Sequence, residues 1–185
     1  MSAEQVNELK RWVAELGRQT TAGGGDESLK LSRVADIVSK NFGVQLHEVA
    51  LMLITPDDRF LRFVLPPMLR NVGQVPLTST NALAARTVRE RRPEVINHFA
   101  VVPHSTVFEA VPIAEDQRSE AIQKIMSAPL VQDRKALGVI QVSRKGRTPG
   151  EAGPDFTHNQ LRELKSIADA LSPLVAQSML EPVKA

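Results

Sequence analysis

Two apolar runs joined by a short polar connector form the most regular pattern in the chain. Residues 125–131 and 136–142 are almost entirely apolar, and residues 132–135 (QDRK) separate them. Two short runs with a polar connector are typical of an antiparallel hairpin. Small residues within such strands, here Ser127 and Gly138, predict that another element packs very close to the backbone.

Helical periodicity marks both ends of the chain. Residues 3–19 place apolar side chains three and four positions apart, which predicts an amphipathic helix, and residues 28–42 repeat the pattern after a glycine-rich joint. A last helix is predicted over residues 158–179, where Thr157 and Gln160 have the spacing of a capping box. Pro173 lies inside that helix and predicts either a kink or a break.

Strand periodicity begins near His47. Residues 47–56 and 59–68 predict a strand hairpin, residues 81–91 a short helix, and residues 93–99 a brief strand. Residues 97–121 have no clean period of either kind, and a segment of that length inside a compact domain often carries function.

The order of these elements predicts an α+β fold. We expect an antiparallel sheet of about five or six strands, with the N-terminal and C-terminal helices on one face. Residues 1–25 are interpreted as an N-terminal helix and joint, residues 26–180 as one domain, and residues 181–185 as a tail.

Composition narrows the function. The chain has no cysteine, which excludes disulfides, thiolate catalysis and thiolate metal ligands. A net charge of +2 is too small to indicate a nucleic acid partner. No apolar window reaches the ~18 residues of a membrane span, and the charged N-terminal residues do not resemble a secretory signal. These features predict a cytoplasmic protein.

Several short stretches follow one another in the order and spacing of a known family. They are LSRVADIV at 31–38, VALMLI at 49–54, GQVPL at 73–77, AAR at 84–86, RPEV at 92–95, IMSAPLV at 125–131, LGVIQV at 137–142 and Phe156-Thr157. Through these stretches the chain resembles a GAF domain from about Asp26 to Met179. The resemblance implies that the hairpin is central in the sheet, that small residues such as Ser127, Ala128 and Gly138 admit the first and last helices, and that residues 97–121 cover a small-molecule pocket on the opposite face.

The specialised activities of that family are not expected in this chain. Members that bind cyclic nucleotides carry an Asn-Lys pair after the last strand and an acidic pair beyond it, whereas this chain has Ser143-Arg144 and Gln160-Leu161. Members that bind bilins or reduce methionine sulfoxide depend on cysteines, which are absent here.

Other polar clusters have simpler explanations. His98, His104 and Glu109 match no metal-site spacing, so we expect these side chains to be satisfied by water or backbone and expect no metal. The arginines between Arg86 and Arg92 lie near a helix C-terminus, where the helix dipole favours cations, and we interpret them as a solvated face. No nucleophile or acid–base pair has a recognisable spacing, so the chain is not expected to be an enzyme.

Two functions remain open at this point. The protein is either a sensor module that binds a small molecule of unknown identity under residues 97–121, or a dimerising interaction module whose pocket is closed. In both cases we expect a homodimer through the terminal helices and a signalling partner that the sequence does not identify. If a ligand binds, the residues expected to contact it are Asn97, Phe99, His104, Phe108, Arg118 and Met126.

Overall fold

The computed structural model describes residues 27–101 and 120–180. In chain order, with η for a short 3-10 helix, the elements are α2 (Glu27–Phe42), η1 (Leu46–Glu48), β1 (Val49–Ile54), β2 (Phe60–Leu65), η2 (Pro67–Leu69), β3 (Gln74–Pro76), α3 (Leu83–Glu90), β4 (Glu94–Ile96), η3 (Phe99–Val101), β5 (Ile122–Gln132), β6 (Lys135–Lys145) and α4 (His158–Leu180). The predicted helix at 3–19 and the tail at 181–185 lie outside the described residues, so the proposed division of the chain stays a prediction.

The strands form one sheet, as predicted. Its strand order is β3-β2-β1-β6-β5-β4, and every pair of neighbours is antiparallel. The hairpin of β5 and β6 is the longest pairing, with β6 bonded to β1 on its other side. Asp133 and Arg134 turn the hairpin with φ of 49° and 67°, the left-handed pair that a two-residue hairpin turn requires.

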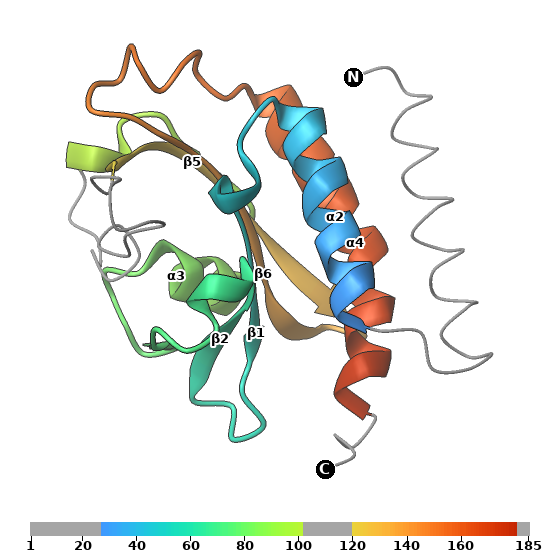
Figure 1. Cartoon of the computed structure of the whole chain (residues 1–185). Helices are drawn as coiled ribbons and strands as arrows, with labels where there is room; N and C mark the ends of the chain where they lie inside the picture. Colours follow the sequence, from blue (N-terminus) through green and yellow to red (C-terminus); the bar gives the residue numbers. More distant parts are fainter. Residues whose placement is uncertain (1–26, 102–119, 181–185) are drawn as a thin grey trace.

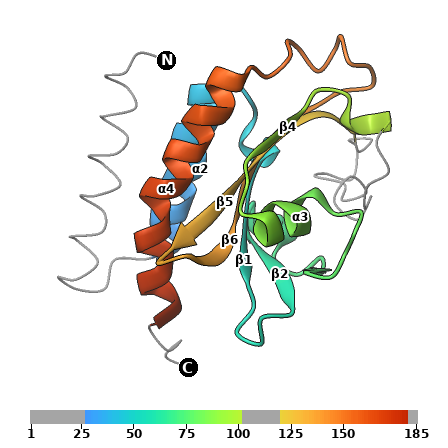
Figure 2. The same ribbon diagram turned by 180° about the vertical axis from the view of Figure 1, so that it is seen from behind.

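Helices cover the two faces of the sheet unequally. Figures 1 and 2 show α2 and α4 side by side against one face and α3 on the other. We call these the helix face and the pocket face. The expectation that the helices at 28–42 and 158–179 share one face is confirmed, and α4 begins with the predicted capping box. There the Thr157 N–H donates to Gln160 Oε1 at 2.9 Å and the Gln160 N–H to Thr157 Oγ1 at 3.2 Å.

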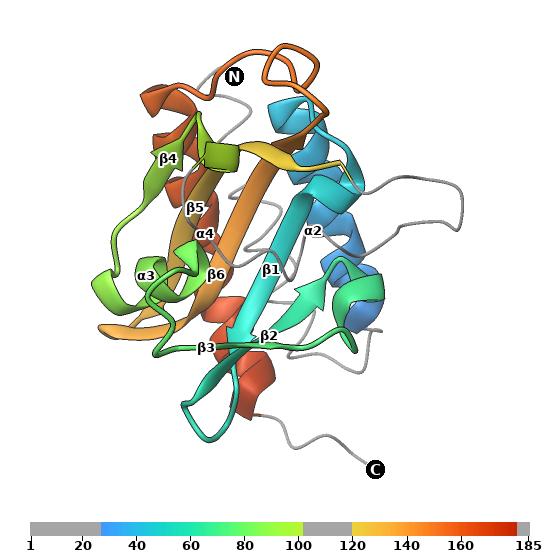
Figure 3. The same ribbon diagram turned by 90° about the vertical axis from the view of Figure 1, so that its left-hand side faces the viewer.

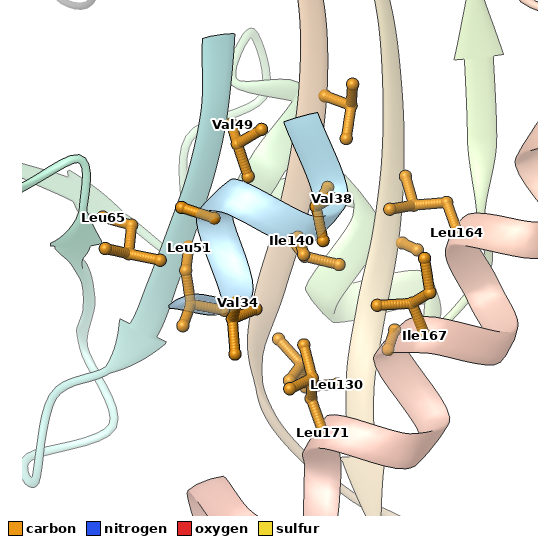
Figure 4. Packing of buried hydrophobic residues seen from close by; sticks show 14 of the residues in the cluster. Val34, Val38, Val49, Leu51, Leu65, Leu130, Ile140, Leu164, Ile167 and Leu171 are labelled. Atoms are coloured by element: carbon orange, nitrogen blue, oxygen red, sulfur yellow. The ribbon is translucent and has the colours of Figure 1, made fainter. Parts of the chain in front are cut away.

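The helix face carries one continuous apolar core (Figure 4). Side chains from α2, β1, β5, β6 and α4 contribute to it because alternate strand residues point to the same face. Its members with the largest fully buried side chains include Val38, Phe42, Val49, Leu51, Leu65, Met126, Leu130, Ile140, Leu164 and Ile167.

Helix α4 continues through Pro173, so of the two predicted alternatives, a kink or a break, the break does not occur. The residue before the proline joins the helix to the sheet instead. Ser172 Oγ donates to Ala168 O at 2.8 Å and accepts from the Val131 N–H at 2.9 Å. This hydroxyl therefore fastens α4 to the end of β5.

The small residues of the hairpin admit different neighbours from those expected. A Cβ added to Gly138 would lie 2.1 Å from Met52 O, so this glycine admits the backbone of the adjacent strand β1. Ser127 bonds to Thr87 of α3 on the pocket face. Ala128 does lie in the core beneath the terminal helices. The close approach that the sequence indicated is real, but only Ala128 lies in the core that faces α2 and α4.

Candidate functional site

A pocket lies on the pocket face, beside α3. Figure 3 views the sheet from this side, with α3 in front of the strands. The pocket contains a cavity of about 60 Å³, which is well above the roughly 10–15 Å³ that a cavity needs in order to hold one water molecule. The described residues that line it are His47, Glu48, Ala50, Phe63, Leu69, Ala82, Leu83, Ala84, Phe99, Ile122, Ile125, Gln141, Ser143 and Lys145.

Strand alternation explains how β6 serves both the core and the pocket. Ile140 and Val142 point into the helix-face core, whereas Gln141, Ser143 and Lys145 line the pocket. The two sets alternate because successive side chains of a strand point to opposite faces. One strand thus carries apolar side chains on its buried face and polar side chains on its pocket face.

The larger part of the pocket is apolar. Leu83 of α3, Phe99 of η3 and Ile125 of β5 form a small buried cluster along its wall. At the start of α3 the lining residues Ala82 and Ala84 have short side chains, which leave space in front of β1 and β6. A pocket with apolar walls and a few placed polar groups is the usual form of a small-molecule site.

The polar end of the pocket is built around Glu48. Its carboxylate accepts the Lys145 N–H at 2.6 Å through Oε1 and the Gln45 N–H at 2.7 Å through Oε2. Its backbone carbonyl accepts a hydrogen bond from Ser143 Oγ at 3.2 Å. Both carboxylate oxygens therefore bind the protein's own backbone, and Glu48 joins η1 to the end of β6.

His47 stands beside this carboxylate. Burial lowers the pKa of His47 below its ordinary value, and the positive charge of Lys145 lowers it further. The carboxylates of Glu48 and Glu120 oppose the shift without reversing it. The imidazole is consequently neutral near pH 7, with one nitrogen as a hydrogen-bond donor and the other as an acceptor.

A buried chain of hydrogen bonds runs from the pocket to α3. Gln141 Nε2 lies 3.1 Å from Ser127 Oγ, Ser127 Oγ lies 2.7 Å from Thr87 Oγ1, and Thr87 Oγ1 donates to Leu83 O at 2.9 Å. Ser127 and Thr87 are almost completely buried, with exposed fractions of 0% and 1%. Each member has a partner, which a buried polar group needs in order to be stable.

Of the three predicted contact residues in the described part of the chain, one lies at this pocket. Phe99 lines it. The Asn97 side chain instead bonds to the backbone of Phe156, donating to its carbonyl at 3.0 Å and accepting from its N–H at 2.9 Å. Met126 lies in the helix-face core, so its expected position under the pocket is wrong. The three remaining residues, His104, Phe108 and Arg118, fall outside the described part of the chain.

Apart from Phe99, none of the described lining residues was among the predicted contacts, and two polar ones on β6 show what was missed. Gln141 lies within the run at 136–142 that was interpreted as apolar, and Ser143 directly follows that run. Polar side chains two positions apart in a central strand are a signal that one face of that strand is not core.

The basic run near α3 is largely occupied with the protein itself. Arg86 forms a two-point ion pair with Glu94, at 3.1 Å and 2.7 Å. Arg89 donates to the carbonyls of Leu77 and Ser79, and Arg91 donates to Arg134 O at 3.1 Å. These contacts hold the end of α3 against β4, residues 77–79 and the turn between β5 and β6.

Two negative observations apply to residues 27–101 and 120–180. No group of three or more histidine or acidic side chains in these ranges is arranged to hold a metal ion. Within the same ranges, no helix combines the length and the apolar character needed to cross a bilayer.

Comparison with known proteins identifies the family. The chain aligns over its full length, and over the full length of the other chain, with the GAF domain of a phosphoenolpyruvate-protein phosphotransferase from Acinetobacter (16% identity, TM-score 0.66). It aligns over 97% of both chains with the corresponding domain from Coxiella burnetii (11% identity, TM-score 0.67). A free methionine-R-sulfoxide reductase from Neisseria meningitidis, solved with its substrate, is similar over 97% of this chain and 96% of that chain (14% identity, TM-score 0.63).

Identities this low establish the fold alone, and no curated protein matches the chain. The sequence profile of the GAF domain matches residues 27–173, which is most of the chain. The six-stranded antiparallel sheet with α2 and α4 on one face agrees with that match. On both grounds, this chain belongs to the GAF domain family.

Proposed function

We propose that this protein is a non-catalytic sensor module that binds a small molecule in the pocket on the pocket face. The observation that carries the proposal is the pocket itself, where apolar walls from α3, η3 and β5 meet a short row of polar groups on β6 and η1. Binding there would act on the module's partners through a change in the protein's shape or stability.

A catalytic role has little chemical support. The similar reductase from Neisseria meningitidis shares the fold, but this chain has no cysteine and therefore no thiolate to carry electrons. The carboxylate of Glu48, which lies at the pocket, already accepts two backbone N–H groups. That arrangement is typical of a structural carboxylate and unlike that of a general base.

The proposal includes a homodimer in the cytoplasm. On the helix face, Ile37 of α2 and Leu161 and Ala170 of α4 adjoin the core but stay partly exposed. Apolar side chains of this kind on neighbouring helices are suited to a second copy of the chain.

The alternative is a dimerising interaction module with a closed pocket. The small size of the cavity favours it, because Phe99, only 6% exposed, already fills part of the space between Leu83 and Ile125. Under this alternative the same surface on α2 and α4 would serve assembly, and no ligand would be needed.

Native mass spectrometry of the full chain, purified under gentle conditions, tests both parts of the proposal. We expect the mass of a dimer, with an additional small mass retained by a fraction of the molecules. The matched variants are Ala50→Leu, which fills the pocket, and Ile37→Glu, which places a charge on α2. Ala50→Leu should lose the small mass and keep the dimer, whereas Ile37→Glu should weaken the dimer and keep the small mass. A dimer with no retained molecule and no response to added metabolites would favour the interaction module.

A further inference from the structure

The buried hydrogen-bond chain fixes which atom of Gln141 the pocket offers to a ligand. The Thr87 hydroxyl gives its one proton to Leu83 O, so in the contact between Thr87 and Ser127 it is the serine that donates. Ser127 has then used its own proton and can only accept from Gln141. The amide of Gln141 must therefore direct its nitrogen toward Ser127.

The amide oxygen of Gln141 is left for the pocket. Gln141 is one of the lining residues, and within the described residues the only hydrogen bond of its side-chain amide is the one from Nε2 to Ser127. Because this acceptor belongs to a largely buried side chain, a ligand that donates a hydrogen bond to it binds more tightly. A ligand that places an apolar or acceptor group against it binds more weakly.

The next pocket-facing residue of β6 presents the same polarity. Ser143 Oγ donates to Glu48 O at 3.2 Å, so toward the pocket this hydroxyl has only its lone pairs to offer. The Glu48 carboxylate, whose oxygens each already accept one backbone N–H, likewise has no proton to donate. Along this wall the pocket therefore presents a row of acceptors.

The charges of the described lining do not favour an ion. Glu48 and Lys145 contribute one charge of each sign, and His47 is neutral near pH 7 because its pKa is lowered. The oxygens of a carboxylate or phosphate ligand would lie against these acceptors and be repelled. The remaining walls are apolar and would not compensate for the lost hydration.

We propose that the pocket selects small neutral molecules with an apolar, ring-sized body and an N–H or O–H donor directed at the Gln141 amide oxygen. This inference rests on the proposed sensor function, since it concerns the same pocket, and it adds the chemical class of the ligand. It also assigns Thr87, which does not line the pocket, as the positioning residue that sets the direction of the Gln141 amide.

Three five-membered rings provide the probe. Pyrrole and furan have nearly the same size and shape, but pyrrole carries an N–H donor whereas furan carries a weak acceptor. N-methylpyrrole keeps the pyrrole ring and removes the donor. Five-membered rings are among the smallest cyclic probes, which suits a cavity of only about 60 Å³. Each compound is titrated into the full ¹⁵N-labelled chain, and binding is followed from the amide signals of Ala84, Phe99 and Gln141.

The inference predicts that pyrrole binds about tenfold more tightly than furan or N-methylpyrrole. In Gln141→Met, which keeps the length of the side chain and removes the acceptor, the preference should disappear. In Thr87→Val, which keeps the shape of the threonine, Ser127 loses its acceptor and can donate to the amide oxygen. The amide then turns its NH₂ group to the pocket, and the ratio of the pyrrole and furan affinities should fall to about one or reverse. A merely structural role for Thr87 would leave that ratio unchanged.

The results distinguish this inference from the proposed function. If all three rings shift the pocket signals with dissociation constants within about twofold of one another, the pocket binds ligands but does not select for an N–H or O–H donor. That selection is called the donor rule below. The rule is also wrong if the wild-type preference survives in both Gln141→Met and Thr87→Val. If no ring shifts the signals of Ala84, Phe99 or Gln141 at its solubility limit, both the donor rule and the sensor function are contradicted.

Discussion

The two faces of the central strands β1, β5 and β6 differ in composition and in packing. The helix face presents one continuous apolar cluster to α2 and α4 (Figure 4). The pocket face divides its apolar side chains between two smaller clusters and places Ser127, Gln141 and Ser143 among them. The same strands thus supply a packed core on one side and a polar-walled cavity on the other.

This difference indicates where stability and function reside in the domain. A continuous apolar core contributes stability in proportion to the area that it buries. A cavity and buried polar groups contribute less stability than an apolar core. We therefore expect them where the protein uses them for binding. Substitutions on the two faces should therefore have different consequences for stability and for binding.

The largest difference is expected between two leucines. Leu164→Ala removes a fully buried side chain from the helix face and should lower the free energy of unfolding by ~2–5 kcal/mol. Leu69→Ala removes the same atoms beside the pocket, where packing is already incomplete, and should cost less. Urea unfolding of both variants measures the difference, and equal losses would show that the pocket face is packed as tightly as the core.

An intermediate effect is expected from the buried hydrogen-bond chain. Ser127→Ala removes the hydroxyl that joins Thr87 to Gln141 and should cost ~1–3 kcal/mol, since two buried groups lose a partner. The double variant Ser127→Ala/Thr87→Val should cost less than the sum of the two single changes, because the residues act in one network. Strict additivity in the same unfolding assay would mean that the chain does not act as a unit.

The smallest effect concerns pH. Because the pKa of His47 is lowered in the folded protein, the unfolded chain binds a proton more readily as the pH falls below about 6.5, the ordinary value for histidine. Protonation of His47 in the unfolded chain therefore lowers the free energy of unfolding as the pH falls from about 6.5 toward the lowered pKa of the folded protein. Above about pH 6.5 the histidine has no such effect. Thermal unfolding from pH 7.5 to 5 should show a shallower pH dependence for His47→Gln than for the wild type. An identical slope would place the proton uptake on other groups.

Much of the fold can be predicted from the sequence because it depends on local patterns. The apolar run around Val139, the capping box at Thr157 and the amphipathic stretch that ends at Phe42 each lie within one element. Such signals need no knowledge of distant partners.

The site could be predicted only in outline because it depends on contacts between distant residues. Met126 was placed under the pocket, but a strand's two faces cannot be told apart from its own sequence when both are buried, and an error of one residue exchanges them. Asn97 was expected to face a ligand, yet its partner is the backbone of Phe156, 59 positions away. The direction of the Gln141 amide follows from Thr87 and Ser127, which come from two other elements.

A thermal-shift screen of a metabolite library on three forms of the protein tests the central claim most directly. Ala50→Leu fills the pocket, and Arg62→Leu places the same side chain at an exposed position of the neighbouring strand β2 as a control. The sensor account predicts at least one compound that raises the melting temperature of the wild type and of Arg62→Leu but leaves Ala50→Leu unchanged. A library in which no compound stabilises the wild type, or in which every stabilising compound acts equally on Ala50→Leu, would contradict it.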